Sequence, residues 1–113
     1  MFRRVLYKQL SGLDVPFQVN LSFFDEERGE ETKTPEGHVV YISFPLNTIG
    51  NTTYYCFFPD DYPLLPPVVI NEELPCHPLV SNNGYVNLCD WCPAINLQQL
   101  ICNLYCITIE AYK

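Results

Sequence analysis

The sequence is poor in basic residues and has no long hydrophobic run. Its 113 residues include 6 Lys and Arg against 13 Asp and Glu, which gives a formal net charge of -7 at pH 7. Binding to nucleic-acid phosphates requires clustered Lys and Arg, so this composition argues against a nucleic-acid partner. No window approaches the roughly 20 consecutive apolar residues that a transmembrane helix needs, which argues against a membrane-spanning protein.

The amino-terminal residues lack the uninterrupted apolar segment of a secretory signal peptide, because Arg3, Arg4 and Lys8 interrupt it. We therefore expect a cytoplasmic or nuclear protein. In such a reducing compartment most of the 6 cysteines should be free thiols. The same cations form a basic end on an acidic chain, which predicts either a solvated helix face or a surface that attracts an acidic partner.

The composition is that of one folded domain. Hydrophobic residues make up 48% of the chain, and a chain of this length buries roughly two-thirds of its unfolded surface around a single core. We therefore expect one domain over residues 1–113.

The hydrophobic periodicity predicts a helix, then antiparallel strands, then a second helix. Apolar residues at three- and four-residue steps indicate helices, and strict alternation indicates half-buried strands. A charged stretch without apolar residues cannot join a core and is expected to be an exposed loop. These criteria predict a first helix within residues 2–13, a strand at 17–24 and an exposed loop at 25–37. Enrichment in β-branched and aromatic residues, with Gly50 between the two segments, predicts a hairpin of 38–44 with 52–58, and a fourth strand is possible at 68–71.

The remaining segments complete an α+β domain. Residues 59–67 contain four prolines, which lack amide donors, so this segment should cross over the sheet without joining it. The second helix should begin at Leu97, with Asn96 as its amino-terminal cap.

Three motifs follow one another along the chain: Tyr62-Pro63-x-x-Pro66-Pro67, His77-Pro78-Leu79 and Trp91-Cys92-Pro93-Ala94. They resemble motifs of ubiquitin-conjugating enzymes, the UBC family. Tyr62-Pro63-x-x-Pro66-Pro67 resembles the family's motif after the sheet, and His77-Pro78-Leu79 resembles its His-Pro-Asn segment. Residues 91–104 resemble its Trp-Ser-Pro-Ala motif and the helix behind it. The resemblance covers nearly the whole chain and implies the UBC fold, with an amino-terminal helix, a four-stranded antiparallel meander, a proline-rich crossing and one following helix. We expect the carboxyl-terminal helices of the full enzymes to be absent.

Two departures from the family fall at its chemistry. The family places a catalytic cysteine three residues after a glycine, and the corresponding residue after Gly84 is Asn87, whose amide cannot act as a thiolate nucleophile. Leu79 stands where the family has an asparagine near the reacting carbonyl, and leucine cannot donate a hydrogen bond to an oxyanion. The chain therefore resembles the inactive ubiquitin E2 variant (UEV) class, which implies a non-catalytic binding or scaffold subunit without metal or cofactor.

The resemblance also implies a partner-binding surface. Ubiquitin-conjugating enzymes dock ligases through the first helix, the loop before the Pro-Pro pair and the Trp-x-Pro-Ala loop. The expected partners are ubiquitin or a ubiquitin-like protein, a conjugating enzyme or a RING-type ligase, within a protein complex. The matching positions are Arg3, Arg4, Leu64, Trp91, Pro93 and Ala94, to which we add Leu65 because two leucines between prolines form either a rigid apolar knob or a pair with one member in the core.

The sequence also allows other interpretations. Sliding the alignment by two residues places Cys89 near the catalytic position, which would make the protein a minimal active enzyme, although the neighbouring Asp90 opposes a thiolate. The domain could also be a structural subunit that never contacts ubiquitin. His77 is either a general base or a structural residue. The pairs Cys89/Cys92 and Cys102/Cys106 have spacings that suit zinc, but cysteines with helical spacing more often face a core.

Overall fold

The computed structural model describes residues 8–25, 28–32, 38–46, 50–62, 64–73, 76–88, 91–92 and 95–111. Residues 8–11 are helical, a five-stranded antiparallel sheet follows, and a long helix, α2, closes the described chain. The α+β architecture predicted from the periodicity is therefore confirmed. The elements are β1 (Asn20–Asp25), β2 (Glu30–Thr32), β3 (Val39–Leu46), β4 (Gly50–Phe57), β5 (Val68–Ile70) and α2 (Leu97–Ala111).

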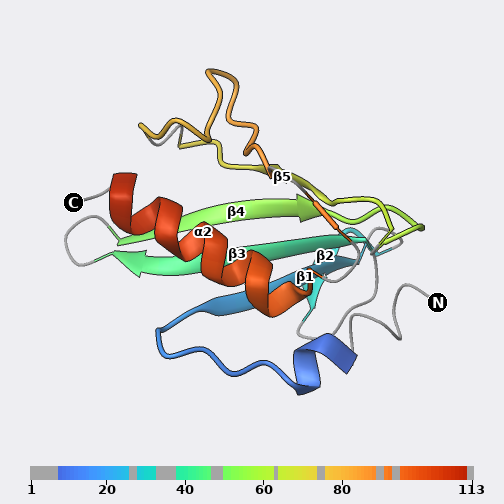
Figure 1. The fold of residues 1–113 in the computed structure, drawn as a ribbon. Coiled ribbons are helices and arrows are strands. Elements are labelled where there is room, and N and C mark those ends of the chain that lie inside the picture. Colours follow the sequence, from blue (N-terminus) through green and yellow to red (C-terminus); the bar gives the residue numbers. More distant parts are fainter. Residues whose placement is uncertain are drawn as a thin grey trace.

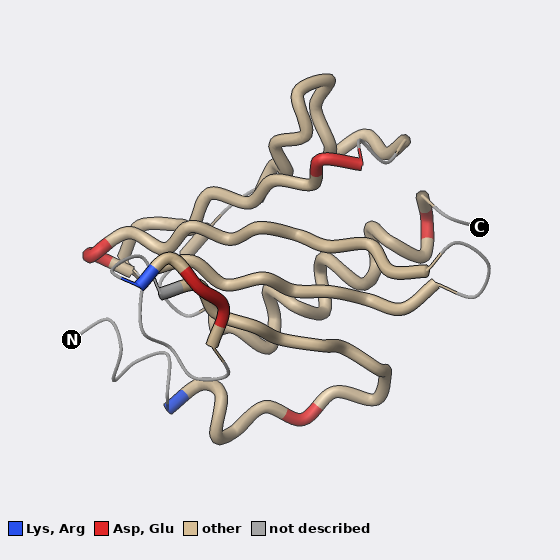
Figure 2. Tube along the Cα trace, turned by 180° about the vertical axis from the view of Figure 1, so that it is seen from behind, with Lys and Arg blue, Asp and Glu red and all other residues tan. Residues whose placement is uncertain are grey.

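The strands lie in the order β2-β1-β3-β4-β5, and every neighbouring pair is antiparallel. Helix α2 crosses one face of this sheet (Figure 1). On the opposite face, seen from behind in Figure 2, no helix covers the strands within the part of the chain that the structure describes. We call the face under α2 the covered face and the opposite one the open face.

Alternation along the strands separates the two faces. In β4, Thr52, Tyr54 and Cys56 are fully buried on the covered face, whereas the alternate residues Tyr55 and Phe57 point to the open face. Helix α2 contributes residues at three- and four-residue steps to the same core, as its periodicity predicted. The fully or nearly buried residues of α2 are Leu97, Leu100, Ile101, Leu104, Ile107 and Thr108.

Two of the predicted elements need correction. Residues 25–37 were expected to form only a loop, but Glu30–Thr32 form the edge strand β2, which pairs with Phe23–Asp25. Its side chains are mostly exposed, so hydrophobic alternation could not reveal it; an edge strand can form through backbone hydrogen bonds alone.

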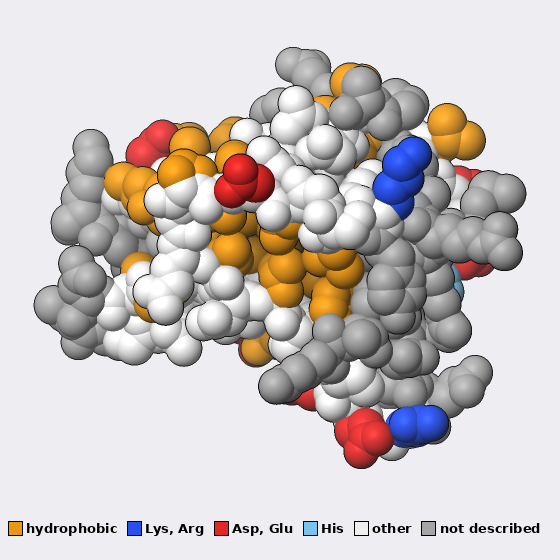
Figure 3. Space-filling view, turned by 90° about the horizontal axis from the view of Figure 1, so that it is seen from below, with side chains coloured by type: hydrophobic (Ala, Val, Ile, Leu, Met, Phe, Trp, Pro, Cys, Tyr) orange, Lys and Arg blue, Asp and Glu red, His pale blue; other side chains and the backbone are white. Residues whose placement is uncertain are grey.

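The first strand begins three residues later than predicted, at Asn20. Phe17 lies outside the sheet and its ring stacks on that of Tyr105 of α2, with centroids 3.8 Å apart and nearly parallel planes. The alternation of half-buried and exposed residues through Val15, Phe17 and Val19 therefore reflects packing against the core and not a strand ladder. Figure 3 views the molecule from below, and hydrophobic side chains are visible in the middle of that face.

The amino-terminal cap predicted for α2 is confirmed. Asn96 Oδ1 accepts a hydrogen bond from Gln99 N (2.9 Å), and Gln99 Oε1 accepts one from Asn96 N (3.2 Å). This reciprocal pair is a capping box, which satisfies amide donors that a helix start leaves without partners. Within the described ranges, no helix has both the length and the hydrophobicity to cross a membrane.

Candidate functional site

The segment that resembles the family's catalytic region is a small hairpin attached to β5. Val86 N donates to Val69 O (2.8 Å), and Asn71 N donates to Gly84 O (2.8 Å). Gly84 has a φ of 88°, a conformation that residues with a side chain rarely adopt. The hairpin is therefore held at a defined position beside the sheet.

Within this hairpin, Asn87 and Leu79 are neighbours. Asn87 N donates to Leu79 O at 2.7 Å, and Val80 bridges to Val86. The structure thus brings together the two positions at which the family would place its thiol and its asparagine. The Asn87 side chain is exposed, and that of Leu79 is half-buried against the core.

His77 connects the start of the hairpin to the end of α2. Its Nδ1 accepts a hydrogen bond from Leu79 N (3.1 Å), so this nitrogen carries no proton. Its Nε2 lies 2.6 Å from Glu110 Oε2, to which Nε2–H can donate. Both ring nitrogens are therefore occupied, and the His77 side chain is only 7% exposed. Pro78, which follows His77, is exposed.

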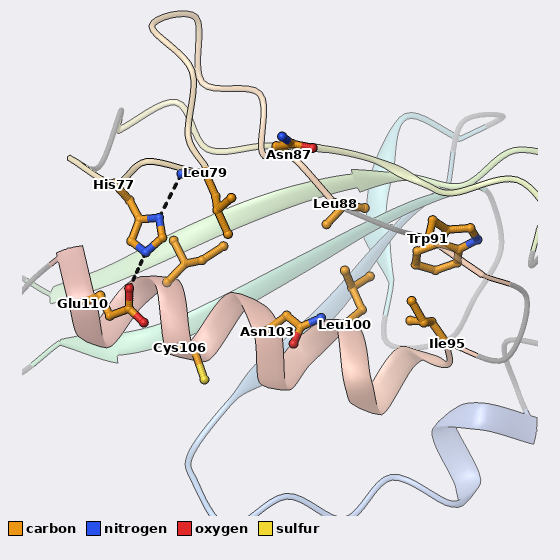
Figure 4. Close-up of a pocket in the computed structure, with 11 residues that line it drawn as sticks. His77, Leu79, Asn87, Leu88, Trp91, Ile95, Leu100, Asn103, Cys106 and Glu110 are labelled. Atoms are coloured by element: carbon orange, nitrogen blue, oxygen red, sulfur yellow. Dashed lines mark hydrogen bonds and ion pairs between the residues drawn. The ribbon is translucent and has the colours of Figure 1, made fainter.

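A cleft of about 310 Å³ separates the hairpin from α2 (Figure 4). Leu79, Leu88 and Trp91 line one side, and Leu100 and Ile107 of α2 line the other. The polar groups of the cleft lie mostly at its rim, at Asn87, Asn103, Cys106 and Glu110. His77 also lines the cleft, and both of its ring nitrogens already have the partners described above.

Contacts around Gln9 and Tyr62 join the first helix, the proline-rich crossing and the Trp91 loop, the three segments that the resemblance assigned to partner binding. Gln9 Oε1, at the end of the first helix, accepts hydrogen bonds from Tyr62 OH (2.7 Å) and from Leu97 N (2.9 Å). The Tyr62 ring in turn lies 6.0 Å from the Trp91 ring. Burial raises the pKa of Tyr62 to about 12, so its hydroxyl remains a donor at neutral pH.

The two leucines of the proline-rich crossing are both exposed, Leu64 by 70% and Leu65 by 50%. Their amides donate to Asp61 O at 2.7 and 3.2 Å, which fixes the turn. The possibility that one of them enters the core is therefore wrong. Trp91 is half-buried at the edge of the cleft, whereas Arg3, Arg4, Pro93, Ala94 and Cys89 lie outside the described residues.

Two of the four cysteines with spacings that suit zinc, Cys102 and Cys106, lie on α2. Cys102 is half-buried and Cys106 is exposed, and neither belongs to the buried residues of α2, so the expectation that both face the core is wrong. Among the described residues, no group of three or more His, Cys, Asp or Glu side chains could hold a metal ion.

Sequence reasoning missed the contribution of α2 to the cleft. Asn103, Cys106, Ile107 and Glu110 recur at three- and four-residue steps, which place them on one side of a helix. That spacing was available in the sequence. The sequence does not show what lies opposite this side of the helix. Residues 77–91 form the opposite wall of the cleft, and only the fold brings them there.

The fold and this geometry can be compared with known proteins. The structure is similar to that of S. cerevisiae Ubc12, with a TM-score of 0.72 and 23% sequence identity, over 96% of this chain and 60% of that chain. The fold is UBC-like. The chain thus spans less than two-thirds of the length of Ubc12, and at this identity the similarity establishes the fold alone. No protein-family model matches the sequence, and no curated protein matches it either.

Proposed function

We propose that this UBC-like domain is a non-catalytic binding or scaffold subunit of a ubiquitin-type conjugation pathway. In this proposal, it binds ubiquitin, a ubiquitin-like protein, a conjugating enzyme or a RING-type ligase. The observation that carries the proposal is the pairing of Asn87 with Leu79 at 2.7 Å, in the hairpin where the family would place its reacting groups.

Thioester formation requires a sulfur nucleophile, and a carboxamide at Asn87 cannot supply one. The tetrahedral intermediate of acyl transfer also needs hydrogen-bond donors directed at its oxyanion. Leu79 contributes an aliphatic side chain there, and its own amide donates to His77 Nδ1. With Nε2–H directed at Glu110, His77 could act as a base only through Nδ1, which already accepts the hydrogen bond from Leu79 N. These features support a role in binding.

The binding surface in this proposal is formed by Leu64, Leu65 and Trp91, with Arg3, Arg4, Pro93 and Ala94 as expected contributors. The Gln9–Tyr62 and Gln9–Leu97 hydrogen bonds tie the first helix, the crossing and α2 together at one place. Prolines and the turn at Asp61 hold Leu64 and Leu65 in their exposed positions. A rigid apolar surface loses little conformational entropy when it binds, which favours recognition of a partner groove.

A loading reaction tests the absence of catalysis. The protein is incubated with activating enzyme, ATP and ubiquitin, and the products are separated with and without reducing agent, beside an active conjugating enzyme as the positive control. We expect no adduct that is sensitive to reducing agent. Such an adduct, lost in Cys89→Ser, would establish the alternative of an active enzyme that uses Cys89.

A titration tests the binding role. Ubiquitin, a conjugating enzyme and a RING domain are each added to ¹⁵N-labelled protein, and we expect saturable shifts at Leu64, Leu65 and Trp91 with at least one of them. Leu64→Asp should abolish those shifts. Ile109→Asp is the matched control, since Ile109 is 46% exposed on α2 and lies apart from this surface. No saturable shift with any of the three would favour a purely structural subunit.

A further inference from the structure

The open face of the sheet carries a cluster of aromatic side chains. Strand register places Phe24, Val39 and Phe57 side by side in one row, and Tyr41 and Tyr55 in the next. The following row on the same face is polar, and there Thr53 Oγ1 donates to Ser43 Oγ at 3.3 Å. The aromatic cluster therefore occupies one end of the open face only.

These side chains line an open hollow of about 380 Å³, together with Ile70 and Glu72. The rings of Tyr41 and Tyr55 are nearly perpendicular, at 85°, with centroids 5.0 Å apart. The Phe24 ring lies 6.4 Å from that of Tyr41. Several aromatic rings beside one another around a hollow are the kind of side chains from which cages for alkylated cations are built.

The charge around the hollow is negative. Glu72 lines it and is exposed. Glu31 pairs with Phe24 across the β1–β2 ladder. Partial burial of Tyr41 is the largest cause that raises its pKa, and the negative charge of Glu31 is the second. No Lys or Arg is among the described residues that line the hollow; the described basic residues are Lys8 and Arg28 (Figure 2).

We propose that this hollow, formed by Phe24, Tyr41, Tyr55, Phe57 and Glu72, binds the alkylammonium group of a methylated lysine side chain on a partner protein. The site lies on the face of the sheet opposite α2 and the cleft. It is thus independent of the surface assigned to ubiquitin-pathway partners.

The chemistry favours an alkylated cation over other ligands. An unmethylated ammonium is strongly hydrated, and a hollow with aromatic walls and a single lining carboxylate would not replace its water. A methylated ammonium keeps the charge, sheds water more easily and contacts the ring faces. The choline headgroup of a lipid has the same cation but carries a phosphate beside it, which Glu31 and Glu72 would repel.

The test is a titration of ¹⁵N-labelled protein with a capped short peptide that has a central trimethyllysine. We expect saturable shifts at Tyr41, Tyr55 and Phe57. The same peptide with a neutral tert-butyl group in place of the trimethylammonium has nearly the same shape without the charge, and it should bind about 10-fold more weakly. Equal binding of the two peptides would overturn the proposal, because the hollow would then be a simple apolar groove.

Two variants connect the binding to named residues. Tyr55→Ala should abolish binding of the trimethyllysine peptide, and Glu72→Gln should weaken it several-fold without removing an aromatic wall. Thr53→Ala, on the same face but in the polar row, is the matched control and should bind as the unmodified protein does. If Glu72→Gln and Tyr55→Ala, both shown to be folded, bind the peptide normally, the hollow is not the site.

Two further probes separate the sources of the cation. Vesicles of phosphatidylcholine should not bind, and their binding through Tyr55 would assign the hollow to lipid headgroups and overturn the proposal. The peptide with unmodified lysine should bind at least several-fold more weakly than the trimethyllysine peptide. If it binds as tightly, the hollow recognises basic peptides in general and methylation plays no part.

Discussion

The two faces of the sheet show how differently neighbouring residues of one strand can be placed. Tyr54 lies on the covered face, is fully buried, and its hydroxyl is 2.9 Å from Thr108 Oγ1 of α2. Tyr55, the next residue, lies on the open face among other aromatic rings and remains partly accessible. The covered face therefore specifies the fold through packing and satisfied polar groups, whereas the open face leaves aromatic side chains available for contact.

The largest expected difference is in cysteine reactivity. Cys56, on the covered face, is fully buried, and burial raises the pKa of its thiol. Modification of Cys56 therefore requires the protein to unfold, and should be slower than that of the exposed Cys76 by a factor on the order of 10³ or more. Labelling with Ellman's reagent, with mass spectrometry to locate the modified residues, measures both rates. Similar rates in the native protein would mean that the covered face opens readily.

Substitution of the adjacent tyrosines compares the faces directly. Tyr54→Ala should lower the free energy of unfolding by about 3–5 kcal/mol, as removal of a fully buried aromatic side chain does. Tyr55→Ala should cost only about 1 kcal/mol, since it removes cross-strand contacts without a core cavity. Urea denaturation followed by circular dichroism gives both values, and equal costs would contradict the distinction between the two faces.

Gln9 should stabilise the junction of the first helix, the proline-rich crossing and α2. Gln9→Ala leaves the Tyr62 hydroxyl and the Leu97 amide without their shared acceptor, which should cost about 1–3 kcal/mol. The neighbouring exposed Lys8 provides the control, and Lys8→Ala should change the free energy of unfolding by less than about 0.5 kcal/mol. A Gln9→Ala protein as stable as the Lys8→Ala protein would show that the three segments are held by packing alone.

The smallest effect is expected at the start of α2. Asn96→Ala removes the capping acceptor of Gln99 N and should cost about 1 kcal/mol. Asn103→Ala, in the exposed middle of the same helix, is the control and should have little effect or raise stability slightly, because alanine is the better helix former. Thermal unfolding of both variants measures the difference, and an unchanged midpoint for Asn96→Ala would exclude a stabilising role for the capping box.

Local sequence patterns predicted most of the elements. Enrichment in β-branched and aromatic residues identified β3 and β4, and residues 68–71, a possible strand in the sequence, include β5. The periodicity with Asn96 identified α2 at its observed start, Leu97. The edge strand β2 was missed because its exposed side chains carry no hydrophobic signal. The start of β1 was misplaced because Phe17 alternates correctly but packs on Tyr105 instead of pairing with another strand.

The candidate site was also only partly predictable from the sequence. The sequence alone determined the amide at position 87, the leucine at position 79 and the acidic composition, because side-chain chemistry does not depend on the fold. Only the tertiary structure decided that Asn87 lies beside Leu79, that His77 reaches Glu110 and that the aromatic residues of three strands share one hollow. These contacts join residues far apart in the chain, and strand register and helix docking, which arise from packing of the whole core, bring them together.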